Sequence, residues 1–295
     1  MADGLATGRT PSRLESPWTG VDAVFGSQRV DEGQIARASY KHSTFVNVSF
    51  KGCVLHDSTF FDCTFIDCYF RNAVLRGCSF VGCRFIDCQF PKVEMSNCDL
   101  RYARFDNCVL DPGEAHTNLP REPNLREELT TRLAVAAEGQ GRSAIARTYR
   151  LWAIEARQQH LAAAVRGENS WYREHFSGID RLLAGVRWLA SRGNGQLWGH
   201  GEKWHVLARN LLGMTFVLFP VLFWMASDGL QKASGTPGFA DYVAVSVASV
   251  IPSADVSTVE LASWTTRVIA GSAAFTGLVA AGLFVTILFR AVTRR

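Results

Sequence analysis

The chain of 295 residues has no cysteine outside residues 53–108, although it contains eight. Their spacings of five and ten residues match no zinc-ligand signature. The seven histidines are scattered and form no metal-ligand pair. A Ser-centred nucleophile elbow, a glycine-rich nucleotide fingerprint and an HExxH motif are all missing. These absences predict a protein that is not an enzyme, with no catalytic residues, no metal and no cofactor.

Two stretches near the C-terminus have no ionisable side chain. Residues 210–227 number 18 and residues 268–289 number 22. A helix rises about 1.5 Å per residue, so each stretch is long enough to cross a hydrocarbon core about 30 Å thick. The absence of charge within both stretches argues against a proton-coupled transporter.

A shorter apolar segment, FADYVAVSVASVIP at 239–252, lies between these two stretches and is too short to span. Valine alternates at Val243, Val245 and Val247, which fits a strand in an extracellular hairpin. We prefer a re-entrant helix, because an isolated apolar strand outside the membrane is prone to aggregate.

Basic residues flank the two stretches on their outer sides, and acidic residues predominate in the connection. The basic residues are Lys203, Arg209, Arg290, Arg294 and Arg295. The acidic residues of the connection are Asp228, Asp241, Asp255 and Glu260, against Lys232 and Arg267. By the positive-inside rule we expect a multi-pass protein of the inner (plasma) membrane with both termini cytoplasmic.

A large apolar residue occupies every fifth position from Phe45 to Leu110, fourteen times without a miss. This period fits neither a helix nor a strand. Small residues, including all eight cysteines, stand two positions before each apolar residue. Asn, Asp or Gly predominates two positions after it, which is the chemistry of tight turns.

This pattern resembles the pentapeptide-repeat family over residues 35–110. The resemblance implies a right-handed quadrilateral β-helix with four pentapeptides per coil, and we expect coils about 4.8 Å apart. The cysteines then need no role beyond being small and buried, and reduced thiols agree with a cytoplasmic N-terminus. Residues 35–110 carry nine Lys/Arg against seven Asp/Glu, which disfavours DNA mimicry and predicts no nucleic-acid partner. A scaffold or a surface for a cytosolic protein partner is favoured.

The sequence divides into four regions. We predict a flexible N-terminus and cap at 1–34, the repeat β-helix at 35–110, a helical connector at 111–203 and a two-span domain at 204–295. Within the connector, Gly139 and Gly141 separate two predicted helices. A basic amphipathic helix over residues 176–197 either lies on an anionic membrane surface or packs on its own domain.

Residues 204–295 resemble the two-transmembrane-helix, pore-loop superfamily of potassium channels in the order span, re-entrant helix, filter, acidic residue, Arg, span. Aligned on the acidic residue, the filter position is occupied by Ser249, Val250, Ile251, Pro252, Ser253, Ala254 and Asp255. The resemblance implies a filter of backbone carbonyls that needs glycines. This segment has no glycine, and Pro252 fixes φ, so a potassium-type filter is not expected.

The sequence therefore predicts a homotetrameric ion channel with a non-potassium filter, whose partners are membrane lipid, permeant ions and copies of itself. Asp255 is interpreted either as part of a cation-attracting ring or as a solvated loop carboxylate. Gly277 and Gly282 are candidate gating hinges. A stripe of small residues at Ala270, Ala274, Gly277 and Ala281 also suits close helix packing. The alternative function is a non-conducting, membrane-anchored scaffold that presents the β-helix to a cytosolic partner.

Overall fold

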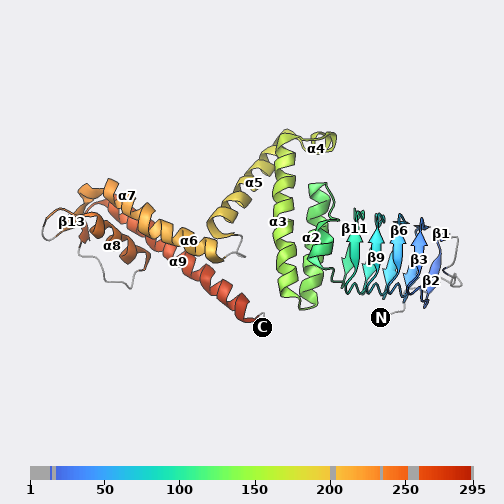
Figure 1. Ribbon diagram of the computed structural model, residues 1–295. Helices are drawn as coiled ribbons and strands as arrows, with labels where there is room; N and C mark the ends of the chain where they lie inside the picture. The colour runs from blue at the N-terminus through green and yellow to red at the C-terminus, as the bar shows by residue number, and fades with distance from the viewer. Residues whose placement is uncertain (1–13, 15–17, 200–203, 233–234, 252–258, 294–295) are drawn as a thin grey trace, which may run out of the picture. The chain divides into compact units, whose positions relative to one another are not determined.

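The computed structural model describes residue 14 and residues 18–199, 204–232, 235–251 and 259–293, and Figure 1 shows the chain as a ribbon. The chain divides into two compact units, Met1–Gly185 and Val186–Arg295. The first unit holds the repeats and several helices, and the second holds both long apolar helices.

The repeat region is a β-solenoid of short parallel strands, visible in Figure 1 as a row of stacked arrows. Paired strands lie twenty residues apart in the sequence, as in Phe45↔Phe65 and Leu55↔Leu75. Isolated bridges such as Ser49↔Tyr69 join the coils on a further side. The strands are β1 (Thr19–Val21), β2 (Val24–Gly26), β3 (Gln34–Ala36), β4 (Ser39–Lys41), β5 (Thr44–Val46), β6 (Val54–His56), β7 (Thr59–Phe61), β8 (Thr64–Ile66), β9 (Val74–Arg76), β10 (Arg84–Ile86), β11 (Glu94–Ser96) and β12 (Arg104–Asp106).

The five-residue ladder forms the solenoid core, as the sequence predicts. Its members from Phe45 to Leu110 are at most 7% exposed. Rings twenty residues apart stack face to face, with centroid separations of 4.7 Å between Phe45 and Phe65 and 4.9 Å between Phe65 and Phe85. These separations match the backbone spacing of about 4.8 Å between paired strands, so hydrogen bonding and ring packing impose the same repeat.

The corners of the coils need a left-handed backbone. Non-glycine residues two positions after the apolar ladder have φ near +50°, a conformation that Asn and Asp tolerate better than other side chains. Gly52 takes the same role at φ +65°. The prediction of turns at these positions is confirmed for Asn47, Asp57, Asp62, Asp67, Asn72, Asp87, Asn97 and Asn107.

All eight cysteines are free and buried inside the solenoid. Several thiols donate to a backbone carbonyl of the preceding coil, as Cys83 Sγ does to Phe60 O at 3.1 Å and Cys68 Sγ to Phe45 O at 3.4 Å. Burial raises the pKa of the Cys53 thiol to about 11. A thiol that stays protonated is a poor nucleophile, so Cys53 acts as a packing group in the solenoid core.

The coils begin earlier than residue 35, the boundary expected from the ladder. Strand β1 pairs with β4, and β2 pairs with β5 through Phe25↔Phe45. Phe25 is 2% exposed and its ring lies 4.9 Å from that of Phe45. Residues 18–34 therefore belong to the solenoid, and the five-residue period of Phe25, Val30 and Ile35 carried the missed signal.

A short helix, α1 (Pro112–His116), closes the C-terminal end of the solenoid. Side chains of α1 and of Asn118, just after it, replace the strand that another coil would have supplied. Glu114 Oε2 accepts a hydrogen bond from Met95 N–H at 2.7 Å, and Asn118 Oδ1 accepts one from Cys98 N–H at 2.7 Å. Asn118 Nδ2 also donates to the Met95 carbonyl. Side chains thus supply hydrogen-bond partners for these backbone groups at the open edge of the last coil.

A helical hairpin follows the cap, as predicted, with Gly139 at the end of its first helix. Helices α2 (Pro123–Gly139) and α3 (Ser143–Arg166) pack closely, and Leu129 and Leu133 of α2 join the solenoid core. Tyr149 of α3 is fully buried and donates its hydroxyl to the Leu110 carbonyl at 3.0 Å. Helices α4 (Ser170–His175) and α5 (Gly178–Trp198) come next.

The second unit packs two long apolar helices around a short one. The first consists of α6 (Trp204–Gly213), the π-helical turn η2 (Met214–Leu218) and α7 (Phe219–Met225), and η3 (Ser227–Gly229) ends it. The short helix α8 (Phe239–Val250) contacts both α7 and the 30-residue helix α9 (Trp264–Thr293). Strands β13 (Leu230–Lys232) and β14 (Val259–Leu261) form an antiparallel pair beside them. A shared core of Phe223, Val245, Val250 and Ala273 joins these elements.

Candidate pore-loop site

A proline shapes the first apolar helix at its centre. Pro220 has no backbone N–H, so it cannot donate to a carbonyl of the preceding turn. The helix widens just before it, where the N–H of Phe219 donates to Met214 O, five residues back. The Thr215 carbonyl consequently loses its α-helical donor, and its π-helical donor would be Pro220, which has none.

Ser246 of α8 supplies the missing donor. Its hydroxyl is fully buried and donates to the Thr215 carbonyl at 2.5 Å. A buried carbonyl that a proline leaves without a backbone donor needs such a substitute, because an unpaired buried polar group is costly. The bond ties the short helix α8 to the first long helix at a defined position.

A glycine allows the C-terminal end of α8 to contact α9. A Cβ on Gly277 would overlap the carbonyl oxygen of Val250. Around Gly277, the buried small residues of α9 are Ala273 and Ala280, whereas Ala281 is exposed. Both candidate hinges, Gly277 and Gly282, lie within the continuous helix α9. The contact shows that Gly277 allows close packing, and a hinge role stays a prediction.

The N-terminal end of α8 is fixed by an ion pair. Lys232 Nζ of β13 lies 2.8 Å from both carboxylate oxygens of Asp241, and the Gly238 N–H also donates to Asp241. Hydrogen bonds from the Lys232 ammonium and this N–H hold the pKa of the Asp241 carboxyl below its ordinary range. A carboxylate in the first turn of a helix also complements the helix dipole.

The structure describes three of the seven predicted filter residues. Ser249 Oγ donates within its own helix to the Val245 carbonyl at 2.7 Å, and Val250 is buried against α9. Ile251, just after α8, is 51% exposed. The other four, Pro252, Ser253, Ala254 and Asp255, lie outside the described residues. In the sequence they lie between α8 and β14, and β14 pairs with β13.

The strand alternative for Val243–Val247 is wrong, because these residues lie within α8. The β13–β14 pair was not anticipated. Each of its strands has only three residues, and alternation over three residues carries almost no information. A buried Gly229 beside Ser263 brings the two strands together, and a Cβ there would overlap the serine side chain.

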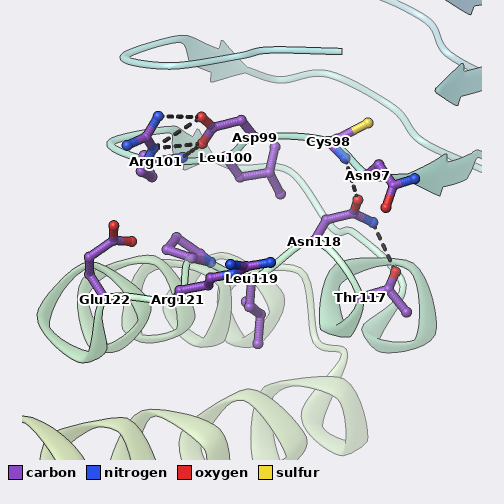
Figure 2. Close-up of a pocket in the computed structure, with 11 residues that line it drawn as sticks. Asn97, Cys98, Asp99, Leu100, Arg101, Thr117, Asn118, Leu119, Arg121 and Glu122 are labelled. Carbon is purple, nitrogen blue, oxygen red and sulfur yellow. Dashed lines mark hydrogen bonds and ion pairs between the residues drawn. The ribbon is translucent and has the colours of Figure 1, made fainter. Parts of the chain in front are cut away.

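A concave surface lies in the first unit, between the last coil and its cap (Figure 2). Its volume is about 400 Å³. The charged pair within it is internally satisfied: both Asp99 oxygens accept hydrogen bonds from the Arg101 guanidinium at 2.7–3.1 Å. Although burial opposes ionisation, these bonds keep the pKa of Asp99 below its ordinary range. Within the described ranges, no three His, Cys, Asp or Glu side chains gather as a metal site.

Comparison with known proteins identifies the repeat region. Residues 40–113 match the family model described as pentapeptide repeats (9 copies), in two overlapping segments, 40–93 and 60–113. No curated protein sequence matches the chain.

Solved structures of other repeat proteins are also similar. The chain is 15% identical to AT2G44920, a pentapeptide repeat protein from the Arabidopsis thaliana thylakoid lumen, over 35% of this chain and 74% of that one, with a TM-score of 0.29. It is 11% identical to HetL, a pentapeptide repeat protein from the cyanobacterium Nostoc sp. strain PCC 7120, over 32% and 41%, with a TM-score of 0.17. The N-terminal part of this protein is a β-solenoid of pentapeptide repeats, and its C-terminal part is helical with two apolar helices.

Proposed function

We propose that this protein is a homotetrameric ion channel of the pore-loop type, with a non-potassium filter and a cytoplasmic β-solenoid for assembly or regulation. The observation that carries the proposal is the arrangement of α8. This short apolar helix is bonded through Ser246 to one long apolar helix and packed through Val250 on the other. Its C-terminal end leads directly into the segment proposed as the filter.

The exposure of the long helices supports insertion in a membrane. His205–Met225 and Trp264–Thr286 are both long and apolar enough to span. Only 28% of the most apolar stretch of the first and 11% of that of the second are buried. A core helix of a soluble protein would be mostly buried, so these surfaces need lipid or further copies of the chain to cover them.

The fixed ends of the loop support a role as a filter. A selectivity filter must hold its ligands in place while ions pass. Here α8 anchors the entry to the loop, and the β13–β14 pair anchors its exit. The lack of glycine between Ser249 and Asp255 argues against a ladder of potassium-binding carbonyls. We propose that selectivity arises from hydroxyl groups and the Asp255 carboxylate.

Reconstitution of the purified chain in a planar bilayer tests the proposal. We expect single-channel currents, a tetramer in detergent, and an altered conductance or reversal potential for Asp255→Asn in asymmetric salt. Glu260→Gln is a matched control, because Glu260 lies on β14 beyond the loop. Absence of any conductance together with a monomer or dimer would refute the channel. An unchanged current in Asp255→Asn would remove this carboxylate from the pore.

The second candidate function is a membrane-anchored scaffold without conductance. The glycine-free loop favours it, because the usual backbone geometry of a pore-loop filter is then not required. The solenoid would present a protein partner with flat faces of mixed charge. This function predicts membrane insertion and partner binding with no current in the same bilayer experiment.

A further inference from the structure

Helix α5 carries an uncovered apolar face along its length. Ile179, Leu182, Val186 and Leu189 follow one another at helical spacing and are 57–73% exposed, and Leu183 beside them is 48% exposed. The opposite face contains the buried Ala184. An apolar stripe about 120° wide that stays exposed along a helix is the pattern of a helix that binds an external apolar surface.

Arginines stand at both edges of this stripe. Arg187 and Arg192 are exposed, and Arg192 also lies over the Trp188 ring, 5.5 Å from its centroid. The acidic residue of the helix is Asp180 in its first turn, where it accepts hydrogen bonds from Ser177. An apolar stripe bordered by cations fits a bilayer with anionic headgroups better than it fits a second copy of the same basic face.

The C-terminal end of α5 is bonded to the start of the first apolar helix. Asn210 Nδ2 donates to the carbonyls of Gln196, at 2.5 Å, and Leu197, at 3.0 Å. Asn210 is also where the uncharged stretch begins. If that stretch spans the membrane, the bonds hold the end of α5 at the level of the headgroups.

Two glycines, Gly193 and Gly195, make the last turns of α5 a poor helix in isolation, since each costs about 1 kcal/mol relative to alanine. Such a segment needs an external surface to remain helical.

We propose that α5 lies on the cytoplasmic surface of the membrane and binds anionic lipid through its apolar stripe and flanking arginines. This inference rests on the proposed function, because membrane insertion of the second unit places the helix.

Spin-label depth measurements on the full chain in lipid nanodiscs test this. A nitroxide at Leu189→Cys is expected about 5–10 Å below the headgroup boundary in discs with anionic lipid. A label at Ser191→Cys, on the other side of the same helix, is the matched control and is expected in water. The native thiols are buried, and the wild-type chain treated with the same spin label measures any background labelling of them.

Charge recognition is tested by replacing Arg187→Gln and Arg192→Gln in the Leu189→Cys background. The ratio of bound to unbound label is expected to fall about fivefold per arginine in anionic discs. An equal population at depth in purely zwitterionic lipid would overturn the assignment to anionic lipid. A Leu189 label in water, or spin–spin broadening between copies at this position, would overturn the inference.

A label at Leu278→Cys, an exposed residue of α9, separates the two proposals. If Leu278 is deep and Leu189 is in water, only the α5 inference fails. If Leu278 is also in water, membrane insertion itself fails.

Discussion

The two units solve the problem of burying apolar side chains in opposite ways. In the solenoid, each coil covers the next, so Phe45 and Leu110 have no exposed surface. In the second unit, Leu278 is 72% exposed and Met225 is 74% exposed. The core of the solenoid is covered by its own coils, whereas much of the described surface of the apolar helices is left exposed. The contrast predicts that stability depends on the chain's own packing in the first unit and on the environment in the second.

The largest effect is expected from breaking the stacked ring column. Phe65 is 1% exposed and its ring stacks on both Phe45 and Phe85. Phe65→Ala should lower the free energy of unfolding by about 3–5 kcal/mol, because a cavity would remain between two layers. Guanidinium denaturation in detergent, followed by the far-UV circular dichroism of the β-strands, measures this change.

Phe61→Ala is the control for the ring column. Phe61 lies on the same coil but is 44% exposed, so its loss should change stability by less than about 1 kcal/mol. Equal effects of the two substitutions would show that the core column does not dominate solenoid stability.

Packing in the second unit is probed next at Gly277. Gly277→Ala places a methyl group on the Val250 carbonyl and should cost about 1–3 kcal/mol, through displacement of α8. Thermal unfolding in detergent and current in bilayers report the effect. Gly282→Ala is the matched control, since a Cβ at this position meets no atom within 4 Å. If both variants unfold at the same temperature, α8 does not depend on this close contact.

An effect of similar size is expected from removing the Ser246 hydroxyl. Ser246→Ala leaves the Thr215 carbonyl without its donor, at a cost of about 1–3 kcal/mol. Ser249→Ala is the control, because Ser249 donates only within α8 to Val245.

Pro220→Ala sharpens the same prediction, since it restores the missing backbone N–H. In that background Ser246→Ala should cost less, and a double-mutant cycle on thermal stability measures the difference. If the stability changes of Pro220→Ala and Ser246→Ala simply add, the Ser246 hydroxyl does not compensate for the donor that Pro220 lacks.

The smallest effect concerns the ion pair at the start of α8. Lys232→Gln should raise the pKa of Asp241 towards its ordinary value, measured by a carboxyl NMR titration. Because the folded-state pKa is lowered, the pair stabilises the protein above the unfolded pKa of about 3.9 and this contribution is lost as the pH falls. The wild-type protein should therefore lose more stability on acidification than the variant. Equal pKa values would exclude the ion pair as the cause.

The solenoid was predictable because its period repeats fourteen times, so each position confirms the others. The earlier coils were missed because Gly20 stands where a large apolar residue was expected, although Phe25 and Ile35 keep the period. In α3 the buried residues include Ala146, Tyr149 and Ala156, whereas Ala144 is exposed. A helix with apolar residues on several faces does not reveal which face its neighbour covers.

In the candidate site, the sequence predicted the short helix and its order between the long ones. It gave no indication of the Ser246–Thr215 bond, which follows from a change in helix type at Pro220. Nor did it show that Gly277 contacts Val250. These residues are 27 positions apart, and packing decides which face of each helix meets the other. Long-range pairings of single residues leave no periodic signal.

The twenty-residue register of the solenoid makes it an adjustable spacer. Because each coil meets its neighbours through the same stacked positions, duplication of one twenty-residue cassette would add one layer of about 4.8 Å without a new core. An insertion whose length is not a multiple of twenty residues would move the following side chains out of their columns. The length of the solenoid therefore changes in steps of one layer, and duplication of the DNA that encodes one coil is enough to lengthen it.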